Sequence, residues 1–322
     1  MRNFQDRPRR PQNRGPDPRL RHSNSSSRPV DEATKKFLAG TAVDPSPRLR
    51  LEDGSKELTM RAMDLICPIG MGQRGLIVAP PGSGKTTFLK HICQAVAKSS
   101  PAVKLYCLLV DERPEEITDF KRSVPAEVRS SSSDETYDHH IATADALMRQ
   151  VYGEAGEGKN VLVVIDSLTR LSRVHNAEGR SSGRTLSGGM DARALEVPRR
   201  IFGSARKIEH GGSLTILATI LVQTGSRMDD VIFEEFKGTG NMEIFLSREI
   251  SSSRIYPAVD IAKSGTRKEE LLLEPAELEG VRKLRRALSG LGTFEAAKTL
   301  IEQLEKYPTN RELLSNLRER QK

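Results

Sequence analysis

The hydrophobic residues of this chain cluster in short continuous runs, and amphipathic stretches separate one run from the next. Apolar runs rich in β-branched residues and leucine are typical of strands buried on both faces. Four runs have this character: 75–79, 104–110, 161–165 and 214–222. Stretches with helical spacing lie between or beside them: 86–98, a segment from Pro114, 139–152 and about 191–210. This alternation predicts an α/β fold, in which helices flank a mostly parallel sheet.

The two ends of the chain depart from this central pattern. A short helix is expected over Glu32–Leu38, and a further helix of polar character is expected after Tyr307. We therefore divide the chain into a basic N-terminal tail (1–30), a short connecting segment (31–60) and one domain with C-terminal helices (61–322).

The net charge of +8 is concentrated in the tail. Residues 1–29 hold eight arginines, two aspartates and five prolines, so +6 of the total charge lies there. This composition, with few apolar residues, predicts disorder. The tail is either a basic arm that adds contacts to nucleic-acid phosphates or a solvated segment with no specific partner.

Composition also narrows the class of protein. The chain has 9 Phe, 5 Tyr and no Trp, which argues against a sheet that reads RNA by stacking bases on exposed aromatic rings. The three cysteines, Cys67, Cys93 and Cys107, form no CxxC pair, so we expect reduced thiols in a cytoplasmic protein. No apolar run is long enough to span a bilayer, and we expect no membrane partner.

The strongest motif is APPGSGKTT at 79–87, between an apolar strand and a helical stretch. This context is the one in which a phosphate-binding loop forms, although Ala79 stands where the usual pattern has glycine. Lys85 is expected to reach the β- and γ-phosphates of a nucleotide, and the Thr86 hydroxyl to ligate Mg²⁺. The backbone amides expected to surround the phosphates are those of Gly82, Ser83, Gly84 and Lys85.

Two carboxylates at strand ends are candidates for the chemistry. Asp166 directly follows the run VLVVI and is a candidate Mg²⁺-associated acid, with the cap of the next helix as the alternative. Glu112 ends the strand of the run LLVDE and is a candidate base that polarises the attacking water. Its alternative is a structural acid at the start of the helix that Pro114 begins.

Six motifs in order resemble the Rho family of bacterial transcription termination factors, from about Arg48 to near Gln303. They are CPIGMGQRGLIVAPPGSGKT, LLVDERPEEIT, VIDSLTRLSR, GSLTILAT, EEFKGTGNME and SGTRKEELL. The resemblance implies a RecA-like P-loop ATPase that assembles as a homohexamer. It also implies the substrate ATP with Mg²⁺, single-stranded RNA along which the ring moves, and RNA polymerase as the eventual target.

The resemblance assigns roles residue by residue. Lys85, Glu112 and Asp166 match the catalytic and metal-associated positions of the family. Arg267 looks like an arginine finger given to the neighbouring subunit's ATP, although spacing alone allows a basic residue at a helix start. Arg254 matches a second arginine acting in trans, and Tyr256 an aromatic ring packed on adenine. Further nucleotide-contacting positions are Gly70, Met71, Gly72, Gln73, Arg74, Gly75, Thr87 and Arg113.

Two loops resemble the RNA contacts of the family's central channel. One is the Gly- and Ser-rich stretch 179–189, with Arg180 and Arg184, and the other is 223–229, with Arg227. Taken alone, both loops are more typical of mobile surface segments, and the ATPase motifs beside them favour RNA contacts.

The chain departs from the family at its N-terminal end. Only about 45 residues precede Arg48, so we expect the family's usual RNA-loading module to be missing and the arginine-rich tail to tether RNA instead. Two alternatives remain beside an RNA translocase: another RecA-like hexameric ATPase, of the rotary or recombinase type, and a regulatory RNA-binding protein without termination activity.

Overall fold

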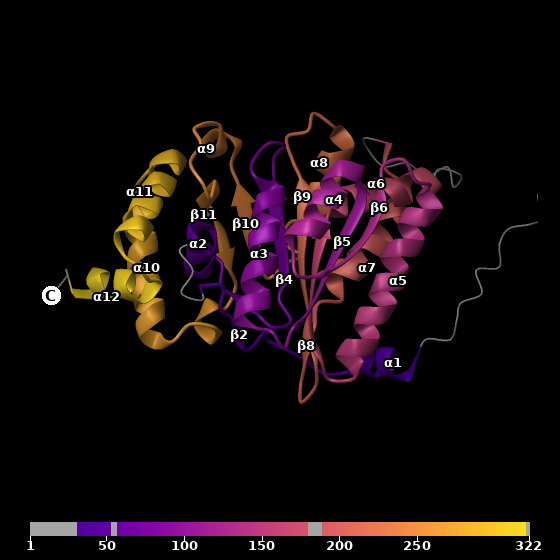
Figure 1. The fold of residues 1–322 in the computed structure, drawn as a ribbon, viewed down its shortest axis with the longest axis horizontal. Coiled ribbons are helices and arrows are strands. Elements are labelled where there is room, and N and C mark those ends of the chain that lie inside the picture. The colour runs from indigo at the N-terminus through magenta and orange to yellow at the C-terminus, as the bar shows by residue number, and fades with distance from the viewer. Residues whose placement is uncertain (1–30, 53–56, 180–188, 320–322) are drawn as a thin grey trace, which may run out of the picture. The chain divides into compact units, whose positions relative to one another are not determined.

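A central sheet runs through the computed structural model, which describes residues 31–52, 57–179 and 189–319 (Figure 1). Within these residues the main path of the sheet has the order β11-β10-β4-β9-β7-β5-β6. The strands are β4 (Arg74–Ala79), β5 (Lys104–Glu112), β6 (Glu127–Ser132), β7 (Asn160–Asp166), β9 (Ser213–Leu221), β10 (Met242–Leu246) and β11 (Val259–Thr266). All neighbours on this path pair in parallel except β10 and β11, which are antiparallel.

Short strands extend this arrangement at the amino ends of the parallel strands. Strand β8 (Arg206–Ile208) pairs antiparallel with β9 and with β1 (Ala42–Val43). A separate two-stranded sheet joins β2 (Arg48–Leu49) to β3 (Ile69–Gly70).

Helices cover both faces of the sheet, and successive strand residues point alternately into two cores. On β4, Ile77 belongs to one core and Leu76 and Val78 to the other. The first core is packed by α2 (Leu58–Ile66), α3 (Lys85–Ser99), α4 (Pro114–Ser123), α10 (Pro275–Ser289), α11 (Thr293–Lys306) and α12 (Asn310–Glu319). The second is packed by α1 (Glu32–Ala39), α5 (Tyr137–Gly156), α6 (Leu168–Gly179), α7 (Glu196–Gly203) and α8 (Arg227–Phe236).

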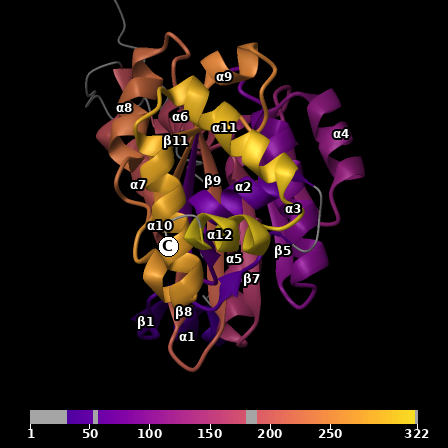
Figure 2. The same ribbon diagram turned by 90° about the vertical axis from the view of Figure 1, so that its left-hand side faces the viewer.

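The C-terminal helices lie at the β11 edge of the sheet, and α12 packs against α10 (Figure 2). Residues from Asp31 onward form one compact unit, in which Phe37 of α1 is buried and α1 packs on α5. The division drawn at residue 60 stays a prediction, and the tail 1–30 lies outside the described residues. Among the residues that the structure describes, no helix combines the length and hydrophobicity needed to cross a bilayer.

The expected α/β architecture is confirmed, including the four buried strands and the helices after 31 and after Tyr307. The single long helix expected over about 191–210 is wrong. The structure has a 3-10 turn (Ala192–Leu195), then α7, and then strand β8. Pro198 fits the first turn of α7 but not a helix interior, since proline lacks the backbone N–H. Residues from Arg206 gain ladder partners on β1 and β9, which a sequence pattern cannot reveal.

Candidate functional site

The phosphate-binding motif lies at the carboxyl end of β4, in the middle of the sheet. The strand ends at Ala79 and α3 begins at Lys85, so the loop between them opens onto the helix N-terminus. Gly82 and Gly84 have φ angles of 75° and 85°, in the left-handed region where a side chain is disfavoured. This turn directs backbone amides and the positive end of the helix dipole toward the same space, an arrangement that suits a phosphate.

Three parallel strands bring the charged residues of the site together. Lys85 begins α3 after β4, Glu112 ends β5 and Asp166 ends β7. The Lys85 ammonium contacts the Asp166 carboxylate and lies 4.0 Å from Glu112 Oε2. Asp166 also accepts a hydrogen bond of 2.8 Å from Thr219 Oγ1, and both carboxylates are buried. The structure thus places two carboxylates and one cation at the mouth of the loop.

Arg170 is a residue of this cluster that sequence reasoning missed. It lies in the first turn of α6 and donates to Glu112 Oε1 at 2.9 Å and to the Asp111 carbonyl. Burial raises the pKa of Glu112, and the Arg170 guanidinium opposes that rise. A sequence signal was available, because Arg170 lies four residues after Asp166, in the first turn of the helix that follows β7.

A cavity of about 440 Å³ lies in front of these groups. Its walls include the loop, Thr86, Thr87, Glu112 and Arg170. Arg113 is exposed at its rim, where its guanidinium lies 3.8 Å from Glu116. No cluster of three His, Cys, Asp or Glu side chains suited to a metal occurs in the described part of the chain. The Thr86 hydroxyl at this cavity and the Asp166 carboxylate beside Lys85 are oxygen groups that could hold a Mg²⁺ ion together with nucleotide oxygens and water.

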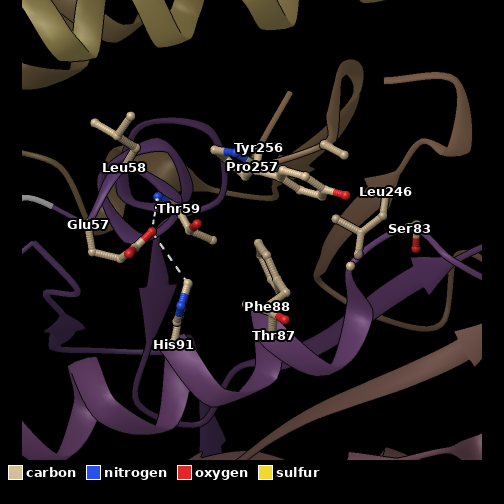
Figure 3. A pocket seen from close by; sticks show the side chains of 12 residues that line it. Glu57, Leu58, Thr59, Ser83, Thr87, Phe88, His91, Leu246, Tyr256 and Pro257 are labelled. Carbon is tan, nitrogen blue, oxygen red and sulfur yellow. Dashed lines mark hydrogen bonds and ion pairs between the residues drawn. The ribbon is translucent and has the colours of Figure 1, made fainter. Parts of the chain in front are cut away.

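A second cavity of about 400 Å³ adjoins the loop on the other side (Figure 3). Apolar side chains from three elements and a loop face each other across it: Leu58, Phe88, Leu246, Tyr256 and Pro257. Tyr256 is 44% exposed and lines the cavity, so its ring is accessible for stacking on a flat heterocycle. Of these, sequence reasoning identified Tyr256 alone.

Polar groups line the far side of the same cavity. Glu57 caps α2 by accepting from Thr59 N at 3.0 Å, and His91 Nδ1 lies 3.4 Å from the Glu57 carboxylate (Figure 3). Since Ser83, Gly84 and Thr87 border this cavity too, a nucleotide whose phosphates lie in the loop could place its base here. Phe88 and His91 had a signal in sequence, because both lie on the helix that follows the phosphate loop.

The segment Gly70–Gly75 does not line either cavity. It precedes and begins β4, and six residues of extended strand span roughly 20 Å. Within one subunit, therefore, this segment lies at the opposite end of β4 from the phosphate loop.

Arg267 lies at the same distant end. Strand β11 runs antiparallel to β10, so Thr266 pairs with Met242, which in turn pairs with Gly75 at the start of β4. Arg267 is exposed and its Nη2 donates to the Gly238 carbonyl at 3.2 Å. Arg254 is also exposed, in the loop after α9 (Arg248–Ser252). The strand pairing therefore places Arg267 at the opposite end of β4 from the phosphate loop of its own subunit.

The expected RNA-binding arginines are only partly described. Arg180 and Arg184 lie outside the described residues. Arg227 begins α8 and is exposed, just after the carboxyl end of β9. Its turn is held by the fully buried Asp229, which pairs with Arg173 of α6 and accepts from Thr224 Oγ1 at 2.6 Å. The arginine is therefore presented by an anchored turn.

Comparison with known proteins identifies a nucleotide-binding domain. Residues 59–266 match the nucleotide-binding domain of the ATP synthase alpha/beta family. The fold is similar to a prototypical ATPase from the type III secretion system of pathogenic bacteria, with 25% identity, a TM-score of 0.64, and coverage of 80% of this chain and 77% of that one. It is also similar to the assembled ATPase EscN of enteropathogenic E. coli, at 24% identity and a TM-score of 0.67, over 87% and 70% of the two chains.

Among curated proteins, the chain is similar to transcription termination factor Rho, which confirms the resemblance of the six motifs. It is 49% identical to Rho of Mycobacterium tuberculosis over 96% of this chain and 51% of that protein. It is 52% identical to Rho of Streptomyces coelicolor and 50% identical to Rho of Aquifex aeolicus, over 85% of this chain in both cases and 66% and 63% of those proteins. The chain thus spans about half to two thirds of the relatives that it matches.

Proposed function

We propose that this chain, which belongs to the ATP synthase alpha/beta family of nucleotide-binding domains, is an RNA-stimulated ATP hydrolase that works as a ring-shaped RNA translocase in transcription termination. The observation that carries the proposal is the convergence of Lys85, Glu112 and Asp166 at the phosphate loop. The similarity to transcription termination factor Rho supports the choice of RNA and of termination.

In this proposal the chain's own residues hold and polarise the reactants. The loop amides of Gly82–Lys85 and the Lys85 ammonium bind the phosphates of ATP, and Thr86 and Asp166 hold Mg²⁺. When bound, Mg²⁺ neutralises charge that develops on the transferring phosphoryl group. Glu112 orients the attacking water and accepts its proton, while Tyr256 stacks on the adenine.

Arg267 completes the site from the next subunit. Its place at the far end of β4 leaves its own nucleotide out of reach, so a homohexameric ring is the arrangement we propose. A guanidinium supplied in trans ties hydrolysis to the geometry of the ring. Arg254 is proposed as a second trans contact, and Arg113 as a contact at the rim of the subunit's own site.

RNA is proposed to pass through the ring against the turn that carries Arg227. The turn is pinned to α6 by the Arg173–Asp229 pair, and α6 also carries Arg170, which bonds the catalytic carboxylate Glu112. Arg180 and Arg184 are proposed as additional RNA contacts. RNA polymerase is the proposed target of translocation.

An ATPase assay with and without nucleic acid tests this function. We expect single-stranded poly(C) RNA to raise the rate of ATP hydrolysis by at least about tenfold, and duplex DNA to leave it at the basal rate. The Glu112→Gln variant should lose about 10²- to 10⁴-fold in kcat and still bind ATP, since it keeps the loop and loses the base. Hydrolysis that ignores RNA would favour another RecA-like ATPase, and wild-type turnover by Glu112→Gln would remove Glu112 from the mechanism.

A further inference from the structure

Asn241 lies where three segments meet at the amino end of β4. Its side-chain Oδ1 accepts hydrogen bonds from Arg74 N at 2.8 Å and from Gln73 Nε2 at 2.6 Å. Its backbone N donates to the Arg74 carbonyl at 3.0 Å. One residue just before β10 thus makes three hydrogen bonds to the start of the strand that leads to the phosphate loop.

The backbone carbonyl of Asn241 holds Arg267. It accepts from Arg267 N at 2.9 Å and from Gln73 Nε2 at 3.1 Å. Gln73 itself is 1% exposed, and its Oε1 accepts from Gly70 N at 3.0 Å, which fixes the orientation of its amide. The residue pair Gln73–Asn241 therefore links the start of β4 to the backbone of Arg267, with Gln73 buried and Asn241 half-buried.

The neighbourhood of Arg267 explains why such a link matters. Arg267 follows the last residue of β11, and the next residue, Lys268, has a φ of 55° and leaves the strand direction. The Arg267 side chain is exposed. Its Nη2 donates to the backbone carbonyl of Gly238, in the turn that precedes β10. A catalytic group displaced by about 1 Å can lose about 10²-fold in rate, so its backbone must be fixed more firmly than its side chain.

We propose that Asn241 is a positioning residue for Arg267, the arginine that reaches the neighbouring subunit's ATP. This inference rests on the proposed function, because it assigns Asn241 a role through Arg267. Asn241 aligns the turn 238–241 with β4, and the turn carries both carbonyls that hold Arg267. The same strand therefore sets the phosphate loop at one end and the trans arginine at the other.

The test compares two substitutions of similar size. Asn241→Leu removes the acceptor oxygen and leaves Arg74 N and Gln73 Nε2 without their side-chain partner. We expect kcat to fall about 10- to 100-fold with the KM for ATP within about twofold of wild type. Asn241→Asp keeps an acceptor oxygen in the same place, and we expect a kcat within about threefold of wild type.

The double variant separates positioning from general damage. If Asn241 acts through Arg267, Asn241→Leu should lower kcat by less than about twofold in an Arg267→Ala background. The proposal would be overturned if Asn241→Leu lowered kcat by the same factor in the Arg267→Ala background as in wild type. It would also be overturned if Asn241→Leu kept a wild-type kcat, or if Asn241→Asp lost as much kcat as Asn241→Leu.

Hydrogen exchange gives a readout that does not depend on turnover. We expect the backbone amide of Arg267 to exchange at least about tenfold faster in Asn241→Leu than in wild type or Asn241→Asp, while amides of β4 stay protected. Unchanged exchange at Arg267 would overturn the positioning role. Absence of turnover in the wild-type protein would instead refute the proposed function, and exchange would still decide whether Asn241 holds Arg267.

Discussion

The two ends of β4 show two different solutions for placing a cation. At the carboxyl end, Lys85 lies among buried carboxylates and is held by ion pairs within its own subunit. At the amino end, Arg267 is exposed, and its guanidinium contacts a backbone carbonyl. A cation that binds a nucleotide of its own subunit can form ion pairs with carboxylates of the same site. A cation that is to contact a neighbouring subunit's nucleotide must stay exposed and free of such ion pairs. In the function we propose, one strand therefore carries two halves of a site that is completed between subunits.

Removing Arg267, the proposed trans arginine, should have the largest effect on ATP hydrolysis. We expect Arg267→Ala to lower kcat by about 10³-fold or more, because an arginine finger stabilises charge in the transition state, with little change in ATP affinity. Steady-state ATPase rates and nucleotide binding measure the two effects separately.

A mixture of two inactive variants tests whether Arg267 acts on the nucleotide of a neighbouring subunit. Lys85→Ala lacks the phosphate contact but keeps Arg267, so rings that contain both Lys85→Ala and Arg267→Ala subunits should hydrolyse ATP at their hybrid interfaces. A mixture as inactive as either variant alone, together with lost ATP binding by Arg267→Ala, would place Arg267 in its own subunit's site.

Arg170 should affect the pH dependence of turnover. Glu112 must be ionised to accept a proton, and burial already raises its pKa, so activity falls as the pH drops through that raised value. Removing the opposing guanidinium in Arg170→Gln should raise the pKa of Glu112 further and move the acid limb of kcat to higher pH.

Arg199→Gln is the matched control for the Arg170 variant. Arg199 of α7 pairs with Glu235 of α8 at the protein surface, and its loss should leave the pH profile unchanged. An acid limb that stays in place in Arg170→Gln would show that Arg170 does not act through the charge of Glu112.

Substitution of Tyr256 in the second cavity, next to the phosphate loop, should give the smallest effect on ATP hydrolysis. Tyr256→Ala removes the stacking face, and we expect the KM for ATP to rise about tenfold with kcat nearly constant, since stacking binds ground state and transition state alike. Tyr256→Phe keeps the ring and should behave like wild type, because its hydroxyl makes only a long hydrogen bond of 3.4 Å to the Ser251 carbonyl. A KM that rises equally in both variants would show that the ring face is not what ATP contacts.

Much of the catalytic strand–loop–helix unit could be predicted from sequence, because it depends on neighbours along the chain. The apolar runs determine the strands, and glycines at 82 and 84 permit the positive φ angles of the phosphate loop. Glu112 and Asp166 follow directly from strand ends, since parallel strands of one sheet bring their carboxyl ends to a common edge.

The remaining features were decided by the tertiary structure, because they join segments far apart in sequence. Arg170 meets Glu112 across 58 positions, and Asn241 meets Gln73 across 168. Residues 70–75 carried a motif that resembles nucleotide contacts, yet the direction of β4 takes them to the far end of the sheet from their own phosphate loop. Sequence by itself thus determined the local chemistry of each strand end, and strand order and direction decided which ends can act together within one subunit.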